Sequence, residues 1–304
     1  MENKIKKRKL GVLVIVIIVV VILGRYYLSL KFKDNNEFKQ SLVDCSYNSE
    51  LVPGSEFVNG QYTYRYKEEG FFSSGNVIWS SISEDGWGVI LTDKKSTAPV
   101  TTKLCSTINN KPIVSMNSMF AESQANSIDL SDFDTSNVTD MSGMFKGSKV
   151  TEIDLSGFDT SKVTGMSWMF YNSALTKIDL SSFDTSKVTN MSGMFNATKL
   201  RELDLSNFDT SNVTNMNSMF SDSALTKIDL SSFDTSKVTN MKSMFYGSKV
   251  TELDLSSFNT ENVADISFMF YDVNDITCYI RTSNDLNKFK SSLDSYQKIN
   301  FIIK

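Results

Sequence analysis

The sequence predicts an α/β solenoid, in which every 25-residue coil adds one strand to a parallel β-sheet and carries one short helix. A small β-rich N-terminal module and a single N-terminal transmembrane helix complete the predicted fold. Three observations lead to it: a phrase that recurs every 25 residues, hairpin-type dipeptides before that phrase, and an apolar run behind a basic N-terminus. The predicted boundaries are residues 1–33 for a cytoplasmic tail and transmembrane signal anchor, 34–112 for a stalk and the β-rich module, 113–272 for the repeats, and 273–304 for a strand–helix–strand cap.

The N-terminal segment has the pattern of a signal anchor. A basic cluster at residues 4–9 precedes an uncharged run from Leu10 to Gly24, and residues 26–30 extend the run beyond Arg25. A bilayer span needs about 20 residues, and an arginine near its end can reach the interface. The basic side is expected in the cytoplasm, which predicts a single-pass protein of the cell membrane with residues after about 33 outside. A cleaved signal peptide and a buried soluble helix remain alternatives.

The composition excludes several kinds of function. The chain has no histidine, so no imidazole can act as a base, proton shuttle or metal ligand. Residues 1–33 hold eight of the 31 Lys+Arg and one of the 35 Asp+Glu, which leaves 23 basic and 34 acidic residues in 34–304. That part carries a net charge of −11, which repels phosphate backbones and predicts that the protein binds no nucleic acid.

The segment before the repeats is predicted to be a small β module. The dipeptides Asn-Gly at 59–60 and Asp-Gly at 85–86 are typical of tight hairpin turns between strands. Cys45 and Cys105 bracket this module and are predicted to pair outside the membrane, with Cys278 left over. A disulfide closing such a loop stabilises the fold by about 4 kcal/mol in the chain-entropy model. Two free thiols are the alternative.

The repeat is the strongest signal in the chain. The phrase Ile/Leu-Asp-Leu-Ser-x-Phe begins at Ile128, Ile153, Ile178, Leu203, Ile228 and Leu253. A fixed period of this length indicates units that each bury their apolar face only against the next unit. Residues 128–133 predict a short strand and residues 134–136 a turn with a helix cap. The spacing of Val138, Met141, Met144 and Phe145 predicts one face of a short helix.

Stacked coils place equivalent residues in columns, and two columns are charged. One alternates in sign and predicts a ladder of surface ion pairs: Glu152, Lys177, Glu202, Lys227 and Glu252. The other, here called the acidic column, consists of Asp129, Asp154, Asp179, Asp204, Asp229 and Asp254. Its carboxylates either accept hydrogen bonds from neighbouring hydroxyl and backbone groups or form weak divalent-cation sites. We commit to no metal and no cofactor.

A third column contains the candidate binding residues. It reads Gly143, Trp168, Gly193, Ser218, Ser243 and Phe268, and on a helical wheel it faces water. Exposed aromatic side chains on a rigid scaffold are typical binding anchors. The predicted ligand-binding residues are Trp168, Tyr171, Tyr246, Phe268 and Tyr271. Packing of Phe268 under the C-terminal segment, and of Trp168 against the N-terminal module, are the alternatives.

The recurring run LDLSxFDTSxVTxMxxMF, over about residues 113–272, resembles the BspA-like leucine-rich-repeat surface proteins, which are also described by a mycoplasma surface-protein repeat and occur mainly in bacteria. The resemblance implies a leucine-rich-repeat-like array, surface display and a binding role, which in some members is adhesion to host proteins or other cells. It carries over no catalytic motif. This chain departs from the family in its few coils and its N-terminal anchor.

These observations predict a membrane-anchored bacterial surface protein that binds another protein or a glycan through its repeats. An architectural envelope protein that self-associates or bridges envelope components is the alternative. We expect no enzyme, because every notable Asp and Ser recurs in each coil, which marks structure and not a unique active site. The ligand and the oligomeric state are not determined by the sequence.

Overall fold

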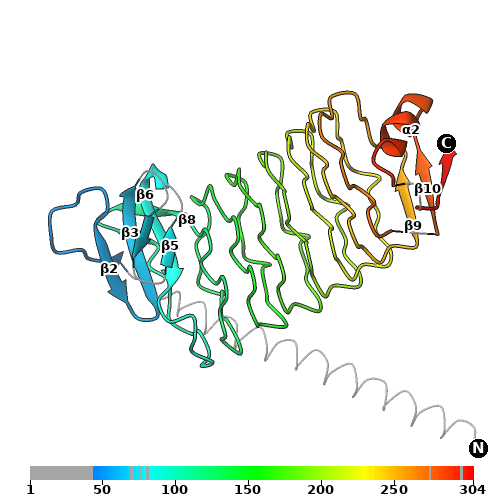
Figure 1. Cartoon of the computed structure of the whole chain (residues 1–304). Coiled ribbons are helices and arrows are strands. Elements are labelled where there is room, and N and C mark those ends of the chain that lie inside the picture. Colours follow the sequence, from blue (N-terminus) through cyan, green and yellow to red (C-terminus); the bar gives the residue numbers. More distant parts are fainter. Residues whose placement is uncertain (1–43, 69–71, 75–76, 80–81, 274, 295–296) are drawn as a thin grey trace, which may run out of the picture. The chain divides into compact units, whose positions relative to one another are not determined.

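The computed structural model describes residues 44–68, 72–74, 77–79, 82–273, 275–294 and 297–304. Cys45–Lys304 forms one compact unit, and only this unit is described below. It begins with a mixed β-sheet, continues through stacked coils and ends in a small parallel sheet with a helix (Figure 1).

The N-terminal module is a six-stranded sheet with the strand order β1-β7-β8-β6-β3-β2. Its strands are β1 (Asp44–Cys45), β2 (Glu56–Asn59), β3 (Tyr62–Glu68), β6 (Ile82–Leu91), β7 (Thr107–Ile108) and β8 (Lys111–Ser115). Strands β2, β3 and β6 pair antiparallel, whereas β8 runs parallel to β6. A separate two-stranded sheet consists of β4 (Phe72–Ser74) and β5 (Val77–Trp79).

One of the two predicted hairpin turns is wrong. Asn59 pairs with Tyr62, so a two-residue loop does join β2 to β3 at the first dipeptide. Gly86, in contrast, lies inside β6 and not in a turn. A β-carbon there would lie 2.6 Å from the carbonyl oxygen of Pro112 and 2.6 Å from Val114. The glycine therefore allows β8 to approach β6 closely, a reason that a dipeptide pattern does not reveal.

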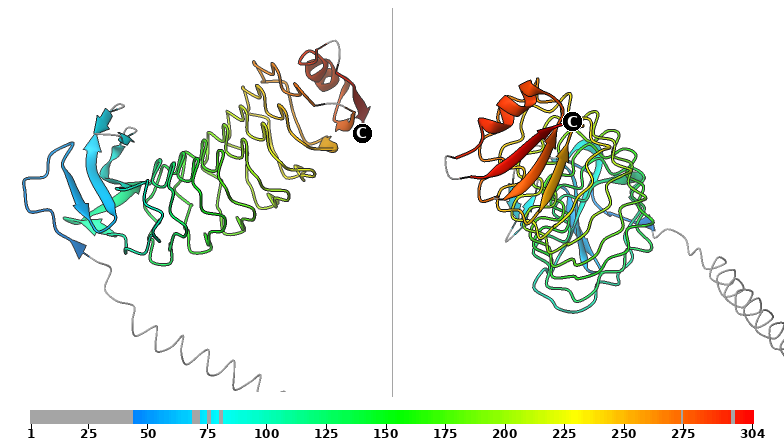
Figure 2. Two further views of the ribbon diagram at one scale, coloured as in Figure 1. Left: turned by 60° about the horizontal axis from the view of Figure 1, so that its bottom comes forward. Right: turned by 90° about the vertical axis from the view of Figure 1, so that its right-hand side faces the viewer.

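The repeat array, residues 113–272, is a stack of coils that lie side by side (Figures 1 and 2). Isolated parallel bridges join successive coils along one column, which consists of Ser115, Asp140, Gly165, Asn190, Asn215, Asn240 and Asp265. Beside it, backbone N–H groups of alternate residues donate to carbonyls 24 residues on, as from Met141 to Gly165 and from Phe145 to Met169. The coils therefore use their hydrogen bonds between neighbours and not within a helix.

The predicted α/β solenoid is therefore wrong. The part of the chain that the structure describes contains one α-helix, α2 (Ser283–Lys290), which lies outside the repeats. The Ile/Leu-Asp-Leu phrase, predicted to give one strand per coil of a leucine-rich-repeat-like sheet, is a strand only in the last coil, as β9 (Glu252–Leu255). The Val-Met-Met-Phe spacing does direct these side chains inward, but through successive tight turns whose backbone N–H groups donate to carbonyls of the next coil.

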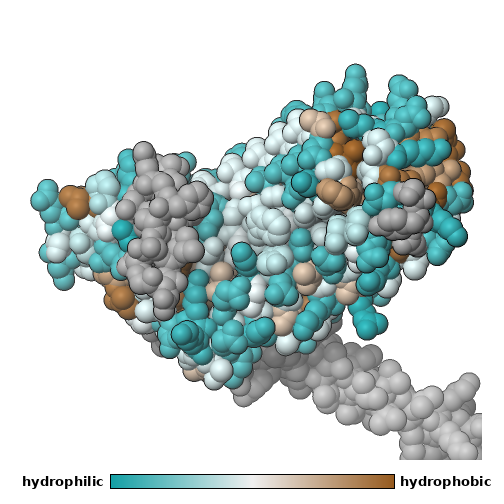
Figure 3. Space-filling model, in the orientation of Figure 1, coloured by the Kyte–Doolittle hydropathy of each residue, from teal (hydrophilic) through white to brown (hydrophobic). Residues whose placement is uncertain are grey.

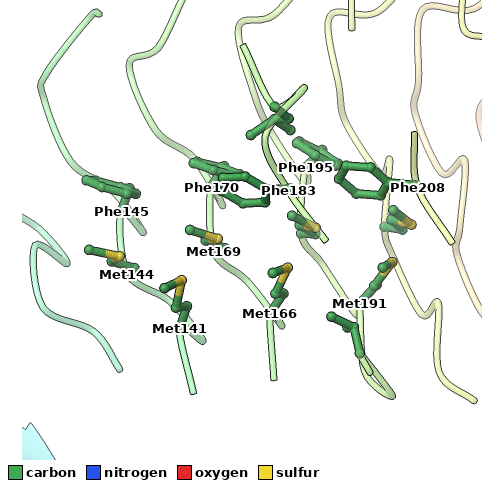
Figure 4. Packing of buried hydrophobic residues seen from close by; sticks show 14 of the residues in the cluster. Met141, Met144, Phe145, Met166, Met169, Phe170, Phe183, Met191, Phe195 and Phe208 are labelled. Carbon is green, nitrogen blue, oxygen red and sulfur yellow. The ribbon is translucent and has the colours of Figure 1, made fainter. Parts of the chain in front are cut away.

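Buried apolar side chains form the core of the array. The rings of the recurring phenylalanine stack from coil to coil, for example Phe145 on Phe170 at 5.9 Å and Phe170 on Phe195 at 5.7 Å between centroids. Figure 4 shows these rings in a row, with methionines such as Met144 and Met169 alongside. The flexible thioethers are fully buried and fill the space between the rings. Each coil thus completes the core of its neighbours.

A buried threonine column holds the coils in register. It consists of Thr135, Thr160, Thr185, Thr210, Thr235 and Thr260. In the first five, the hydroxyl both donates to a backbone carbonyl of the next coil and accepts from a backbone N–H there. Thr210 does so with Asp234, at 2.9 and 2.8 Å. Every hydroxyl of this kind joins two coils and leaves no buried polar atom unsatisfied.

The C-terminal cap ends the stack. Strands β10 (Ile276–Ile280) and β11 (Ile299–Ile303) continue from β9 as a parallel sheet with the order β11-β10-β9. Helix α2 lies between them in sequence and is capped by Thr282. The buried carboxylate of Asp285 accepts from the N–H and the hydroxyl of Thr260, at 3.0 and 2.8 Å. The carboxylate thus replaces the backbone groups of a next coil to which the hydroxyl of Thr260 would otherwise bond.

The predicted membrane anchor, residues 1–33, lies outside the described residues. Across the residues that are described, no helix has the length and apolar character needed to cross a bilayer. The predicted single-pass placement is corrected accordingly, and the cell-surface location that depended on the anchor is withdrawn.

Candidate binding face

The column of Gly143, Trp168, Gly193, Ser218, Ser243 and Phe268 has a left-handed backbone in every coil and is here called the left-handed column. Its φ angles are all positive, from +55° to +62°. Only glycine adopts this region freely, and a side chain there costs roughly 1–2 kcal/mol. A tryptophan and a phenylalanine at these positions are therefore conformational outliers, of the kind that collect at functional sites.

Trp168 lies across the surface of the following coil. A β-carbon on Gly193 would lie 2.3–2.5 Å from three adjacent atoms of the Trp168 six-membered ring. Because the three distances are almost equal, the face of the ring and not its edge covers Gly193. A β-carbon projects away from the backbone, so the opposite face of the indole points outward. The side chain is accordingly half-buried, and Gly193 is buried beneath it.

Two further residues complete what we call the Trp168 cluster. Tyr171 meets the indole edge-on, with centroids 5.2 Å apart and an angle of 84°. The ammonium of Lys146, one coil earlier, lies 5.4 Å from the centre of the Tyr171 ring, within cation–π range. This cluster holds two of the five predicted ligand-binding residues together.

The other three predicted residues form a second group, the Phe268 cluster. Tyr246 and Tyr271 stack at 5.0 Å with nearly parallel rings, and Phe268 meets Tyr271 edge-on at 6.0 Å. Lys242 lies 5.9 Å from the centre of the Phe268 ring. Phe268 is 48 % exposed, so the C-terminal cap does not cover it, contrary to the packing alternative.

Trp168 and Phe268 lie four coils apart, about 19 Å at the usual strand spacing, and Tyr246 lies one coil nearer to Trp168. Between Trp168 and Phe268 lie Gly193, Asn196, Ser218 and Ser243. Together with the clusters they form what we call the aromatic strip. The structure therefore does not bring all five predicted residues to one point; it places them at two ends of a strip of small, uncharged side chains. In Figure 3, much of the surface over the middle coils has near-neutral hydropathy.

The acidic column serves the backbone of its own coil. Each carboxylate accepts from the N–H two residues on, as Asp179 does from Ser181 at 2.9 Å. Hydrogen bonds from the backbone and hydroxyl of that serine hold the pKa of Asp179 below its usual value. For Asp254, burial raises the pKa, but hydrogen bonds from Lys304 and Ser256 outweigh it. Among the residues described, no group of three or more acidic, histidine or cysteine side chains could hold a metal.

The alternating charged column does not form the predicted ion pairs. All five of its side chains are exposed, and within the described chain none of them makes a salt bridge. Exposed pairs contribute at most about 1 kcal/mol, so long side chains lose little by remaining solvated.

Cys45 and Cys105 form a disulfide in the structure, with their Cα atoms 5.8 Å apart. The amide of Asn59 donates to both sulfur atoms, at 2.8 and 3.2 Å. Cys278 is a free thiol in the core of the cap, and burial raises its pKa to about 12, so it is unreactive.

Two overlapping segments, residues 94–200 and 172–284, match the family described as "Mycoplasma protein of unknown function, DUF285". Together they cover residues 94–284, which is more than half of the chain. This chain belongs to the DUF285 family. No curated protein and no solved structure shows significant similarity to it. The match agrees with a mycoplasma-type repeat, and it does not extend to the BspA-like proteins in particular.

Sequence reasoning on this DUF285 chain missed three residues of the face. Gly193, which makes room for the indole, could have been found because it follows Trp168 by one period in the same column. Lys146 and Lys242 carry no sequence signal of their own, because their relation to the rings depends on the turn geometry.

Proposed function

We propose that this DUF285 protein is a non-enzymatic binding protein that presents the aromatic strip to a macromolecular partner, a protein or a glycan. The observation that carries the proposal is the left-handed backbone of Trp168 and Phe268. In the other coils the position holds glycine, which adopts this backbone freely, or serine, which bears the same backbone cost with a small side chain. Selection of two large aromatic side chains at strained positions is expected when the side chain itself has a use.

The composition of the aromatic strip supports the same proposal. Binding surfaces of adaptable recognition proteins are rich in tyrosine, tryptophan, serine, glycine and asparagine, because rigid rings give contact area and small polar groups give hydrogen bonds. The strip consists of these residue types and one phenylalanine, flanked by two lysines. It lies on a backbone fixed by hydrogen bonds to both neighbouring coils, so little order has to be gained on binding. The resemblance to BspA-like proteins, some of which adhere to host proteins, agrees with such a role.

An architectural role is the second candidate, and β11 is the observation that favours it. Within the described chain β11 pairs only with β10, and Ile302 and Ile303 are 39 % and 48 % exposed. Open apolar strand edges pair readily with other chains. Sedimentation of the full chain over a range of concentrations measures this self-association directly.

The test of the proposal compares three full-length proteins: the natural chain, Trp168→Gly, and Ser118→Gly as a matched control outside the strip. Each is immobilised and titrated with purified extracellular-matrix proteins and with a defined set of glycans. We expect a saturable partner whose binding weakens by about 2 kcal/mol or more in Trp168→Gly. Ser118 has the same left-handed backbone, with a φ of +54°, and lies one coil before Gly143. The Ser118→Gly control therefore changes an equivalent backbone position outside the strip and should bind normally. Equal binding by all three proteins contradicts the proposal, and self-association without any partner supports the architectural role.

A further inference from the structure

We infer that the aromatic strip binds an uncharged, unbranched oligosaccharide, one sugar ring of which stacks on Trp168 while a more distant ring of the same chain reaches the Phe268 cluster. This inference rests on the proposed function, because it names the ligand class of the same face. Four features of the strip lead to it: the orientation of the indole, the charge of the strip, its unused hydrogen-bonding groups and the recurrence of an aromatic side chain four coils on.

The indole of Trp168 offers one flat, open face. Its other face covers Gly193, and its contact with Tyr171 is edge-on. A pyranose ring has an apolar face of C–H groups that matches a flat aromatic ring in size. The indole fills the space that the missing side chain of Gly193 leaves, so a ligand meets a flat ring at this point.

The charge of the strip matches a neutral ligand. Residues 113–272 contain 11 Lys+Arg and 21 Asp+Glu, so the array carries a net charge of −10 and repels polyanions. Between the clusters, the strip itself has no charged side chain in either of its columns. The two lysines at its ends lie over aromatic rings of their own clusters, at 5.4 and 5.9 Å. An uncharged chain thus meets neither repulsion nor an unpaired charge along the strip.

Hydrogen-bonding groups line the path between the two clusters. Asn196, Ser218 and Ser243 are half-buried, and within the described residues their side chains make no hydrogen bond to protein. The carboxylates of the acidic column and the hydroxyls of the threonine column are, in contrast, occupied with backbone groups, as Asp179 and Thr210 are. Sugar hydroxyls both donate and accept, so they can use these three side chains without leaving any group unsatisfied.

The repetition of the motif indicates a chain and not a single sugar. Phe268 occupies the same column as Trp168, with the same φ of +59°, four coils further on. A ligand that contacts both Trp168 and Phe268 must extend along the stacking direction for about 19 Å. Two linked contacts of this kind strengthen binding well beyond either alone.

The experiment titrates the full chain with cellohexaose, chitohexaose and hexagalacturonate, and with the matching disaccharides, by tryptophan fluorescence and calorimetry. We expect at least one neutral hexasaccharide to bind and to change Trp168 emission, with the acidic hexamer and the disaccharides at least about tenfold weaker. Trp168→Gly and Phe268→Gly should each weaken the neutral hexamer by about tenfold or more, and the control Ser118→Gly, outside the strip, should not.

Each other outcome overturns the inference. If neither neutral hexamer binds, or if binding is the same in all variants, the strip is not a site for such a chain. If sugars fail while a protein partner is lost in Trp168→Gly, the proposed binding function stands and only the carbohydrate assignment falls. If the acidic hexamer binds best, the ligand class is anionic and the charge argument is wrong.

Discussion

The acidic column and the left-handed column run along the same repeat array but vary in opposite ways. The acidic column is aspartate in all six coils, and each carboxylate performs the same local hydrogen bonding. The left-handed column has a constant backbone and a variable side chain, from glycine to tryptophan. Side chains that the coil needs are therefore repeated, whereas the position that tolerates variation carries the aromatic residues. Stability and recognition are separated by column, and substitutions can test this separation.

The largest loss of stability is expected at Asp285, where the threonine column ends. Asp285→Ala removes the carboxylate that serves Thr260, Thr282 and Arg281. It leaves buried donors without partners, and we expect the free energy of unfolding to fall by about 3 kcal/mol. Urea denaturation measures the change, with Asn287→Ala on the exposed side of the same helix as the control. A loss confined to Asn287→Ala, or none in Asp285→Ala, would show that the cap does not terminate the array in this way.

A single link of the threonine column should have a smaller effect. Thr210→Val keeps the shape but removes the hydroxyl that bonds both the N–H and the carbonyl of Asp234. Two backbone groups lose their partner, so we expect the free energy of unfolding to fall by about 2 kcal/mol. Thr210→Ser should recover most of this stability. Binding to any partner of the aromatic strip should be unchanged. If stability is normal in the valine variant, the column does not hold the register.

A double-mutant cycle tests the contact between Trp168 and Gly193. In Gly193→Ala the new methyl group would overlap the indole of Trp168, and the alanine would also have to adopt the strained left-handed backbone. We therefore expect the free energy of unfolding to fall by about 2 kcal/mol. In the Trp168→Gly background only the backbone strain remains, and the loss should fall to about 1 kcal/mol. Thermal unfolding of the four proteins gives the coupling energy. A coupling of zero means that the ring does not lie on Gly193 in solution.

This contact also shows how far the sequence can lead. The period, the inward-facing Val138 and Phe145 and the column shared by Trp168 and Phe268 follow from the sequence, because each depends only on which residues recur. The helix does not, because a spacing of three and four residues also arises from successive tight turns whose backbone bonds go to the next coil. Gly143 and Gly193 in the column were the available sign, since repeated glycine argues against a helix interior and for positive φ.

The stability that the acidic column contributes should be lost at low pH, in a defined pH range. The pKa of each of its carboxylates is lowered in the folded protein, so each favours the folded state above the ordinary pKa of about 3.9. This stabilisation is complete at neutral pH and is lost as the pH falls through the lowered folded-state values. Asp204→Asn keeps the acceptor oxygen but cannot be protonated there, and its unfolding should depend less on pH below about 4. Unfolding curves from pH 7 to pH 2 provide the measurement, and an unchanged pH dependence argues against this origin.

The smallest effect is expected from a second column of buried hydroxyls, most of which, unlike those of the threonine column, have no partner within the described chain. The hydroxyls of Ser148, Ser173, Ser223 and Ser248 are buried and, within the described chain, make no hydrogen bond. Ser173→Ala removes a buried polar atom that has no hydrogen-bond partner. The free energy of unfolding should therefore be unchanged or should rise by up to about 1 kcal/mol relative to the natural chain. Thr198, one coil further on in this column, bonds to the Phe195 carbonyl at 3.0 Å and serves as the matched control. Thr198→Val should lower stability where Ser173→Ala does not. If both substitutions destabilise the protein equally, the buried serine hydroxyls have hydrogen-bond partners in solution. Every polar residue that recurs at a buried position of this array would then be hydrogen-bonded.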